Sequence, residues 1–361
     1  MKFVHIADMH FDSPFVNLSD KDVMGDLRRL EQRKVFKKVI EYIKQEKVEH
    51  LFIAGDLYEH QYVKLSTIEY INRLFQEIPE TRIWIAPGNH DPYLKNSYYH
   101  QFTWSENVTI FENKITRVEL PEMDIYGFGF GDFYCTGSGI ENLEIQDKNK
   151  INVLLMHGTL DGASLEDKQY HSISKKMLQE KGFDYIALGH IHKPYYDSEN
   201  MQKIVYPGST VSLGFDELGK HGMIVGNLEK ESLQYEFMTL DEAEFKEITI
   251  DMTDIFAKED LIEKINDLSV QPNEYIKIIL KGNRNFEINP YEILKLISNE
   301  RIIKIKNDTK IAVDLEKLAN ENTLRGIFIK MMKEKLEEKD LNQEEKDRIE
   351  KAIEIGLDAL K

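Results

Sequence analysis

Short apolar runs that alternate with helical patterns constrain the fold of this chain more than any other feature. Eight such runs lie at 3–8, 50–56, 82–91, 123–130, 151–158, 183–192, 203–209 and 222–229. Several are apolar on both faces, which indicates strands of a buried sheet. A helical pattern follows the first run, with its apolar stripe at Leu30, Val35, Phe36, Val39, Ile40 and Ile43. This alternation predicts an α/β layered domain.

Two smaller regions follow, so we expect three domains: residues 1–240, 241–313 and 314–361. The second region contains strand patterns and helix patterns in turn, which predicts a small α+β cap. The third contains two amphipathic stripes, at Leu324, Ile327, Phe328, Met331, Met332 and Leu336 and at Ile349, Ala352, Ile353, Gly356, Leu357 and Leu360. Asn342 stands between them as an N-cap with Glu345 three residues later. We expect a C-terminal helical hairpin.

Composition excludes several classes of protein. Of the 361 residues, 41% are apolar, and 47 basic against 64 acidic residues give a net charge of −17. This balance excludes a generally basic nucleic-acid-coating protein. The single cysteine, Cys135, excludes a disulfide framework and fits a reducing cytoplasm. The sequence lacks a signal-peptide pattern and a membrane-spanning apolar run, so we expect a cytoplasmic protein with no membrane contact.

Polar motifs follow five of the apolar runs. They are Asp8-Met9-His10, Gly55-Asp56, Gly88-Asn89-His90-Asp91, His157-Gly158 and Gly189-His190-Ile191-His192. The carboxyl ends of strands in a layered α/β sheet meet at one edge, where ligand sites form. Asp8 and His10 are two residues apart, so in an extended chain they would point the same way, and the same holds for His190 and His192.

The residue types in these motifs indicate a metal centre. Carboxylate, imidazole and amide oxygen without thiolate suit manganese, iron or zinc. Seven such groups are too many for one tetrahedral site, but they suit two divalent metals that share a carboxylate. Such a pair can polarise a phosphoryl group and stabilise both ends of an in-line displacement.

The five motifs, in this order and spacing, resemble those of the calcineurin-like metallophosphoesterase superfamily. The resemblance implies a layered β-sandwich flanked by helices. It also implies that one metal is held by Asp8, His10 and His192, that Asp56 bridges, and that the second metal is held by Asn89, His157 and His190. His90 would lie beside the phosphate without ligating a metal, and would give a proton to the leaving oxygen.

Three segments indicate which branch of this superfamily the chain resembles. They are residues 5–15, 189–194 and 206–209 (HIADMHFDSPF, GHIHKP and YPGS). They are similar to SbcD-type exonucleases, and DSPF is most similar to the YhaO branch. This resemblance implies a manganese-dependent exonuclease that degrades duplex DNA ends 3′-to-5′ in double-strand-break repair. Its partner would be an SbcC-like coiled-coil ATPase, held by the C-terminal helices. A homodimer, a phosphodiesterase for small nucleotides and a non-catalytic scaffold remain alternatives.

Some residues near the motifs have two interpretations each. Glu59, three residues after Asp56, could orient His90 or have no role there. Asp91 could pair with the imidazole of His90 or cap the following segment. Asp12 and the serine after it could form a turn or position the substrate.

Other side chains are expected to be structural. The aromatic residues within 93–104 could stack on bases but are more simply packed in a loop. His5 is expected in the core, and His221 could lie at the edge of the site. A surface position is expected for the histidines that match no motif, which are His50, His60, His100 and His171.

Overall fold

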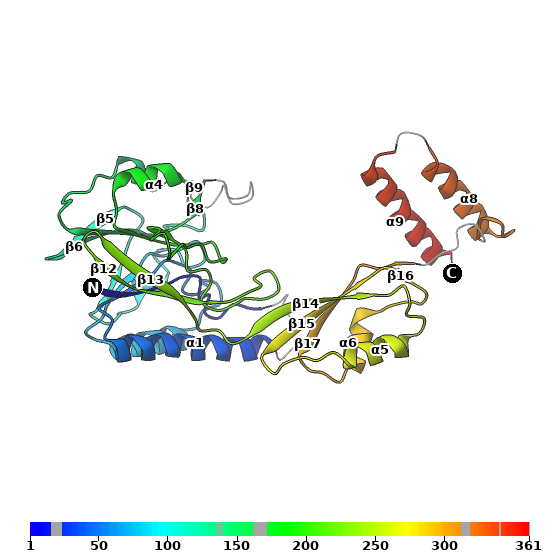
Figure 1. Ribbon diagram of the computed structural model, residues 1–361, viewed down its shortest axis with the longest axis horizontal. Coiled ribbons are helices and arrows are strands. Elements are labelled where there is room, and N and C mark those ends of the chain that lie inside the picture. The colour runs from blue at the N-terminus through cyan, green and yellow to red at the C-terminus, as the bar shows by residue number, and fades with distance from the viewer. Residues whose placement is uncertain are drawn as a thin grey trace. The chain divides into compact units, whose positions relative to one another are not determined.

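The computed structural model describes residues 1–15, 24–135, 137, 139–161, 172–311, 318–338 and 341–360. The chain divides into two compact units, Met1–Phe245 and Lys246–Lys361 (Figure 1). The predicted boundary at 313/314 and His171 lie outside the described residues, and the division into three domains stays a prediction. No helix among the described residues has the length and apolar character to cross a membrane.

The first unit contains a six-stranded mixed sheet in the order β13-β12-β1-β2-β3-β4. These strands are β1 (Lys2–Ile6), β2 (His50–Ile53), β3 (Arg82–Ile85), β4 (Val108–Ile110), β12 (Gly222–Glu229) and β13 (Ser232–Thr239). β1 to β4 run parallel, whereas β12 and β13 are antiparallel to their neighbours. The parallel strands β1 and β2 are buried on both faces almost throughout, as their apolar runs predict.

A five-stranded sheet in the order β11-β10-β7-β6-β5 forms the second half of this unit. It consists of β5 (Thr116–Glu119), β6 (Met123–Phe128), β7 (Ile151–His157), β10 (Tyr185–Gly189) and β11 (Ile204–Val205). All neighbours are parallel except β5 and β6. Smaller elements complete the unit: α3 (Tyr98–Gln101), η1 (Ile140–Asn142), β8 (Thr159–Leu160) and β9 (Ser172–Ile173).

Helices cover the outer faces of the two sheets. Residues of α1 (Met24–Glu46) and α2 (Leu65–Gln76) share a hydrophobic cluster with one face of β1, β2 and β3. The opposite face of these strands packs against the five-stranded sheet through residues such as Phe52, Trp84 and Leu155. Beyond it lies a third cluster that includes Leu178 of α4 (Lys175–Lys181). The prediction of a layered α/β fold flanked by helices is therefore confirmed, and both of its main sheets are mixed.

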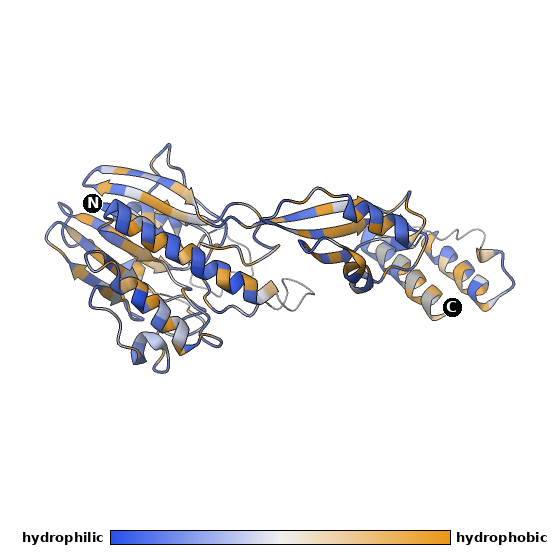
Figure 2. Cartoon of the chain, turned by 90° about the horizontal axis from the view of Figure 1, so that it is seen from below, coloured by the Kyte–Doolittle hydropathy of each residue, from blue (hydrophilic) through white to orange (hydrophobic). Residues whose placement is uncertain are grey.

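The buried stripe of α1 differs from the predicted one at its amino-terminal half. Leu30 is 56% exposed, whereas Arg28 and Gln32 are fully buried. A side chain two residues from both of them points to the opposite side of a helix with 3.6 residues per turn. Gln32 donates hydrogen bonds to the backbone carbonyls of Met9 and His10, at 3.0 and 3.1 Å. Polar side chains therefore interrupt the buried stripe of α1. Figure 2 shows hydrophilic and hydrophobic residues alternating along this helix.

The second unit begins with a small α+β module. Its sheet has the order β14-β15-β17, formed by β14 (Glu244–Asp251), β15 (Glu274–Lys281) and β17 (Ile302–Asn307). The helices α5 (Lys258–Asn266) and α6 (Pro290–Leu296) share one hydrophobic cluster with these strands. A short pair, β16 (Asn283–Arg284) and β18 (Lys310–Ile311), accompanies them.

Two C-terminal helices, α8 (Leu324–Leu336) and α9 (Gln343–Ala359), pack against each other. Asn342 and Glu345 form the reciprocal cap expected before α9: each side chain accepts the other's backbone N–H at 2.9 Å.

The apolar stripe predicted for α8 is divided between a buried side and an exposed side of the helix. Phe328 and Met332 pack into the cluster that α8 and α9 share. Leu324, Ile327 and Met331, at i, i+3 and i+7, are 58–70% exposed instead. We call these three residues the outer face of α8.

Candidate metal centre

The five sequence motifs meet at the carboxyl ends of five strands. Asp8 and His10 follow β1, Asp56 follows β2, and Asn89 follows β3. In the facing sheet, His157 ends β7, and His190 and His192 follow β10. Because these strands run parallel to their neighbours within each sheet, all seven predicted ligands lie at one edge.

The backbone turns sharply where it carries these side chains. Asp8, His10 and Asp56 have φ values of 50°, 48° and 51°, a left-handed conformation that non-glycine residues rarely adopt. The extended geometry expected for Asp8 and His10 is therefore wrong. A Cβ on Gly88 would lie 2.3 Å from Asp56 Oδ1, so only glycine fits there.

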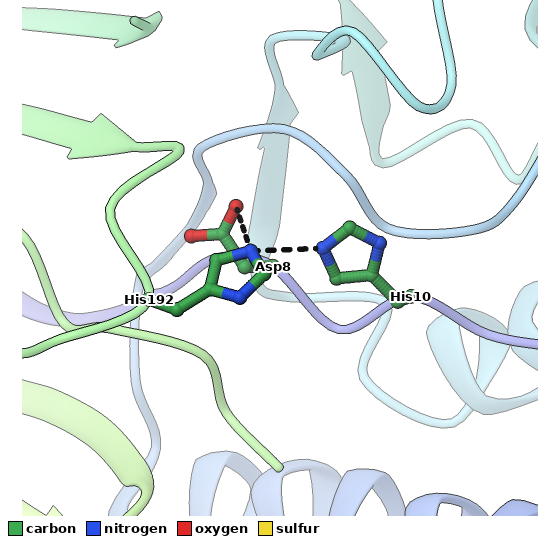
Figure 3. A group of neighbouring side chains, drawn as sticks. All are labelled: Asp8, His10 and His192. Atoms are coloured by element: carbon green, nitrogen blue, oxygen red, sulfur yellow. Dashed lines mark hydrogen bonds and ion pairs between the residues drawn. The ribbon is translucent and has the colours of Figure 1, made fainter. Parts of the chain in front are cut away.

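Asp8, His10 and His192 form the first cluster, which we call the Asp8 half-site. His10 Nε2 lies 3.2 Å from His192 Nε2, and His192 Nε2 lies 3.9 Å from Asp8 Oδ1. Figure 3 shows the carboxylate and the two rings turned toward one another. One potential ligand atom from each residue lies within 4.8 Å of the others.

Asn89, His157 and His190 form the second cluster, the Asn89 half-site. The Oδ1 atom of Asn89 lies 3.0 Å from His157 Nε2 and 3.2 Å from His190 Nδ1. His190 and His192 therefore face different half-sites, so the expectation that they point the same way is wrong.

Asp56 lies between the two half-sites. Its Oδ2 atom is 3.7 Å from His10 Nε2 and 3.3 Å from His157 Nε2. Burial opposes its charge, but the neighbouring imidazoles of His157 and His10 hold the pKa of Asp56 well below its usual value. Asp56 is thus an ionised carboxylate within reach of both clusters, as a bridging ligand must be.

Asp91 supports the loop that carries Asp56 instead of pairing with the ring of His90. Its carboxylate accepts hydrogen bonds from the backbone N–H groups of Asp56 and Leu57, at 3.0 and 2.7 Å. It also accepts from Gly88 N–H and the Tyr99 hydroxyl, each at 2.6 Å. Asp91 therefore fixes the strand ends of β2 and β3 relative to each other.

Glu59 joins two histidines of the site. Its two carboxylate oxygens lie 2.8 Å from His10 Nδ1 and 3.0 Å from His90 Nδ1. Despite burial, these hydrogen bonds hold the pKa of Glu59 at about 2. Burial also opposes charge on His90, but the contact with Glu59 and the charge of Asp56 raise the pKa of His90 to about 9. The His90 side chain is 46% exposed, so its second nitrogen is accessible to a substrate.

Hydrogen bonds also fix the rings of His157 and His192. His157 Nδ1 donates to the Ala54 carbonyl at 2.9 Å, and His192 Nδ1 donates to Glu217 Oε1. Sequence reasoning missed Glu217, and likewise Gln32, which holds the backbone at His10. No motif spacing marks either residue, because each reaches the site from a separate segment.

The donor set fits two divalent cations. His10 and His157 donate from Nδ1, so their Nε2 lone pairs face the site, and the carboxyl groups of Asp8 and Asp56 and the amide oxygen of Asn89 complete the set. Although burial opposes protonation, Glu217 and Asp8 raise the pKa of His192 to about 9, and Asp56 does the same for His157. A cavity that favours a proton so strongly also favours a metal cation, which would displace it.

The other predicted residues lie around this centre in structural roles. Asp12 accepts hydrogen bonds from Lys64 N–H and the Thr67 hydroxyl, at 3.1 and 2.6 Å, so it caps the start of α2. His221 is buried behind the site against the hydroxyl of Ser209, at 2.9 Å. The aromatic residues of the loop after β3 pack together and onto the core, as the simpler interpretation holds.

Two histidines outside the motifs are buried in the sheets. His5 is buried beside Tyr185, as expected. His50 is buried too, so its expected surface position is wrong, because Trp84 Nε1 donates to it at 3.0 Å between two stacked rings.

Comparison with known proteins gives the same family from sequence alone. The profile "Calcineurin-like phosphoesterase" matches residues 1–194. The chain is 25% identical over 277 residues to the "Uncharacterized metallophosphoesterase YhaO" of Bacillus subtilis (strain 168), covering 74% of this chain and 67% of that protein. It is 27% identical over 254 residues to the SbcD subunit of the SbcCD nuclease of Staphylococcus epidermidis, covering 61% of this chain and 64% of that protein.

The chain also matches solved structures. The crystal structure of TT1561 of Thermus thermophilus covers 65% of this chain and 98% of its own, with 12% identity and a TM-score of 0.39. The chain spans about two thirds of the length of both curated relatives. Since the family profile covers more than half of the sequence, and its span contains all seven predicted ligands, the chain belongs to the calcineurin-like phosphoesterase family.

Proposed function

We propose that this chain is a two-metal phosphodiesterase whose substrate is DNA, and that it acts as a manganese-dependent exonuclease, 3′-to-5′, on duplex ends. One observation carries the phosphodiesterase chemistry: two half-sites share Asp56, and the accessible imidazole of His90 stands beside them. Asp8, His10 and His192 would hold one ion, and Asn89, His157 and His190 the other, with manganese preferred over iron or zinc.

The residues of the chain divide the chemistry between them. Two bound ions would polarise the phosphoryl group and stabilise charge on the attacking and leaving oxygens. Glu59 accepts the Nδ1–H of His90 and keeps that ring charged. The Nε2–H of His90 then gives its proton to the leaving sugar oxygen, as a general acid does. Because Glu59 also holds His10, the proton donor keeps a fixed position relative to the Asp8 half-site.

Similarity to an SbcD nuclease subunit supports DNA as the substrate, and net charge argues against broad DNA binding by this chain alone. A surface that binds DNA through counterion release is basic, whereas the chain carries −17. Lys203, for example, lies beside Asp184 at the amino-terminal ends of β10 and β11, at the edge opposite the metal centre. We therefore propose that an SbcC-like ATPase, bound through the outer face of α8, supplies part of the DNA contact.

The acidic charge favours one alternative, a phosphodiesterase for small nucleotides. The test is hydrolysis by the purified chain with Mn²⁺ of linear duplex DNA, labelled at either end, and of bis(p-nitrophenyl) phosphate. Shortening of DNA from 3′ ends supports the nuclease. Turnover of the small diester alone supports the alternative, and no turnover of either supports the scaffold.

A matched pair of variants tests the role of His90 in the same assays. His90→Asn should lose about 10²- to 10⁴-fold in kcat, the range for general acid–base groups, while it retains bound metal. His100→Asn removes an exposed imidazole from the short helix α3 and should leave turnover unchanged. Equal activity of the two variants would contradict the role of His90.

A further inference from the structure

The two half-sites differ in what lies behind their histidines. In the Asp8 half-site, both imidazoles donate Nδ1–H to a carboxylate: His10 to Glu59 and His192 to Glu217. In the Asn89 half-site, the ring of His157 donates to a neutral backbone carbonyl, that of Ala54. A carboxylate behind an imidazole fixes its tautomer and makes its free nitrogen a stronger metal ligand than a carbonyl does.

The residues predicted to bind metal directly also give the Asp8 half-site more negative charge. Asp8 gives the Asp8 half-site a carboxylate of its own, whereas the corresponding oxygen of the Asn89 half-site belongs to an uncharged amide. Asp56 lies between the two and serves both. The Asp8 half-site therefore combines its own carboxylate, Asp8, with the carboxylates of Glu59 and Glu217 behind its two histidine rings.

Glu217 is itself held firmly in place. Its Oε2 accepts hydrogen bonds from the hydroxyl of Ser209 at 2.7 Å and from the backbone N–H of Leu213 at 3.1 Å. His221 contacts Ser209 and the Glu217 carbonyl in turn, at 2.9 and 2.8 Å. These contacts occupy one oxygen and leave Oε1 directed at His192, so the ring cannot turn without breaking the network.

We propose that the two half-sites bind metal unequally: the Asp8 half-site retains its ion more tightly, and Glu217 is the positioning residue that holds His192 for it. The Asn89 half-site then fills second and exchanges its ion more readily. This inference rests on the two-metal site of the proposed function, but it does not depend on DNA being the substrate.

The experiment is a titration of the metal-free protein with Mn²⁺, followed by calorimetry and by the electron paramagnetic resonance signal of free Mn²⁺. The unaltered chain should bind two ions in two resolved steps. Asn89→Ala should abolish the weaker step and retain the tighter one. Glu217→Gln presents an amide N–H to His192 Nδ1, which favours the tautomer with a proton on Nε2. It should weaken the tighter step by about 10- to 100-fold and leave the weaker step in place.

Two controls separate this effect from loss of charge or of fold. Asp216→Asn removes the adjacent, exposed carboxylate and should leave both steps unchanged. Glu217→Asp keeps a carboxylate and should restore part of the lost affinity. Loss of the tighter step in Asn89→Ala, equal affinities in the unaltered chain, or an unchanged tighter step in folded Glu217→Gln would each overturn the proposal. All readouts are metal binding, so a failure to cleave DNA would leave their outcome unaffected.

Discussion

Asp56 occupies the most demanding position in the metal centre. Its backbone has the left-handed φ of 51°, its N–H is bound by Asp91, and its Oδ1 accepts the backbone N–H of His90 at 2.8 Å. Only Oδ2 then remains directed at the histidines of both half-sites. The residue is thus oriented by its surroundings before any metal binds.

Substitution of Asp56 should release both metals. Asp56→Ala removes the carboxylate that lies between the two half-sites and within reach of both, so we expect metal content after dialysis to fall from two ions per chain to nearly none. His10→Ala, by contrast, should lose mainly one ion. Elemental analysis measures both. Asp56→Asn, which keeps an acceptor for His90 N–H, controls for damage to the loop, and two ions retained in Asp56→Ala would refute the bridging role.

At the residue scale, the sequence indicated the ligands but not the residues that orient them. The seven predicted ligands follow apolar strands in short motifs, so residue type and position suffice to predict that they meet at one edge of the sheets. Glu217 lies 25 residues from His192 on another loop, and Gln32 lies inside a helix. Only the folded chain brings these side chains to the site, because their contacts depend on tertiary structure rather than on local spacing.

At the scale of elements, the strands β1 and β2 carry two buried histidines that must stay neutral. Desolvation lowers the pKa of His5 to about 3, and burial lowers that of His50 to about 4. In the unfolded chain both rings have an ordinary pKa near 6.5. Below that pH the unfolded state binds more protons, so this contribution to stability is complete above about pH 6.5 and is lost as the pH falls toward 4.

We therefore expect His50→Gln to flatten the acid dependence of stability. A glutamine oxygen can still accept the Trp84 N–H but does not titrate. Between pH 7 and pH 5, the unaltered chain should lose up to about 2 kcal/mol more unfolding free energy than the variant. Urea unfolding with chelator present measures it, and His100→Gln serves as the exposed control. Parallel curves for His50→Gln and the unaltered chain would contradict the prediction.

Elements differed in how well the sequence predicted them. The parallel strands β1, β2, β3, β7 and β10 are nearly buried, so hydrophobicity alone located them. The edge strands β4 and β5 were not predicted, because they have only three and four residues and every position is partly or fully exposed. The apolar pattern also misplaced Leu30, since hydrophobicity gives no sign that Arg28 and Gln32 would occupy the buried stripe.

At the scale of the whole molecule, the helix α8 has one apolar side that packs against α9 and another that is exposed. Ile329, Ile353 and Leu357 are buried between the two helices, whereas Ile327 and Met331 are exposed. The pair therefore has an apolar core of its own, and the outer face of α8 is exposed, which is where we propose that an ATPase helix binds.

A charged side chain on the outer face of α8 should weaken binding of the ATPase partner without unfolding this chain. Ile327→Glu should change stability by no more than about 0.5 kcal/mol, as is usual at exposed positions. It should weaken binding of the ATPase by about 10-fold or more if Ile327 is an anchor. Lys330→Glu places the same side chain on another exposed position of α8 and is the matched control.

Deletion of residues after 318 should weaken binding of the ATPase more than Ile327→Glu does. The metal content of the first unit should stay unchanged. The first unit contains its own hydrophobic clusters and all seven predicted ligands, which is why its folding should survive. Undiminished co-purification of the truncated chain with the ATPase would place the contact elsewhere. Collapse of its thermal stability would instead favour docking of the helices on the chain itself.

The polar interruption of α1 has a consequence for protein engineering. A procedure that optimises helix propensity and apolar burial would replace Arg28 and Gln32 by leucine, since both occupy fully buried positions. Yet Gln32 holds the carbonyls of Met9 and His10, and Arg28 donates to the Ser212 carbonyl at 2.7 Å. A redesigned helix could be packed more tightly and still lose these hydrogen bonds. The loops that position Asp8, His10 and Glu217 would then no longer be held by α1. Any stabilised version of this protein should therefore keep these two polar residues and gain its stability from substitutions at other positions.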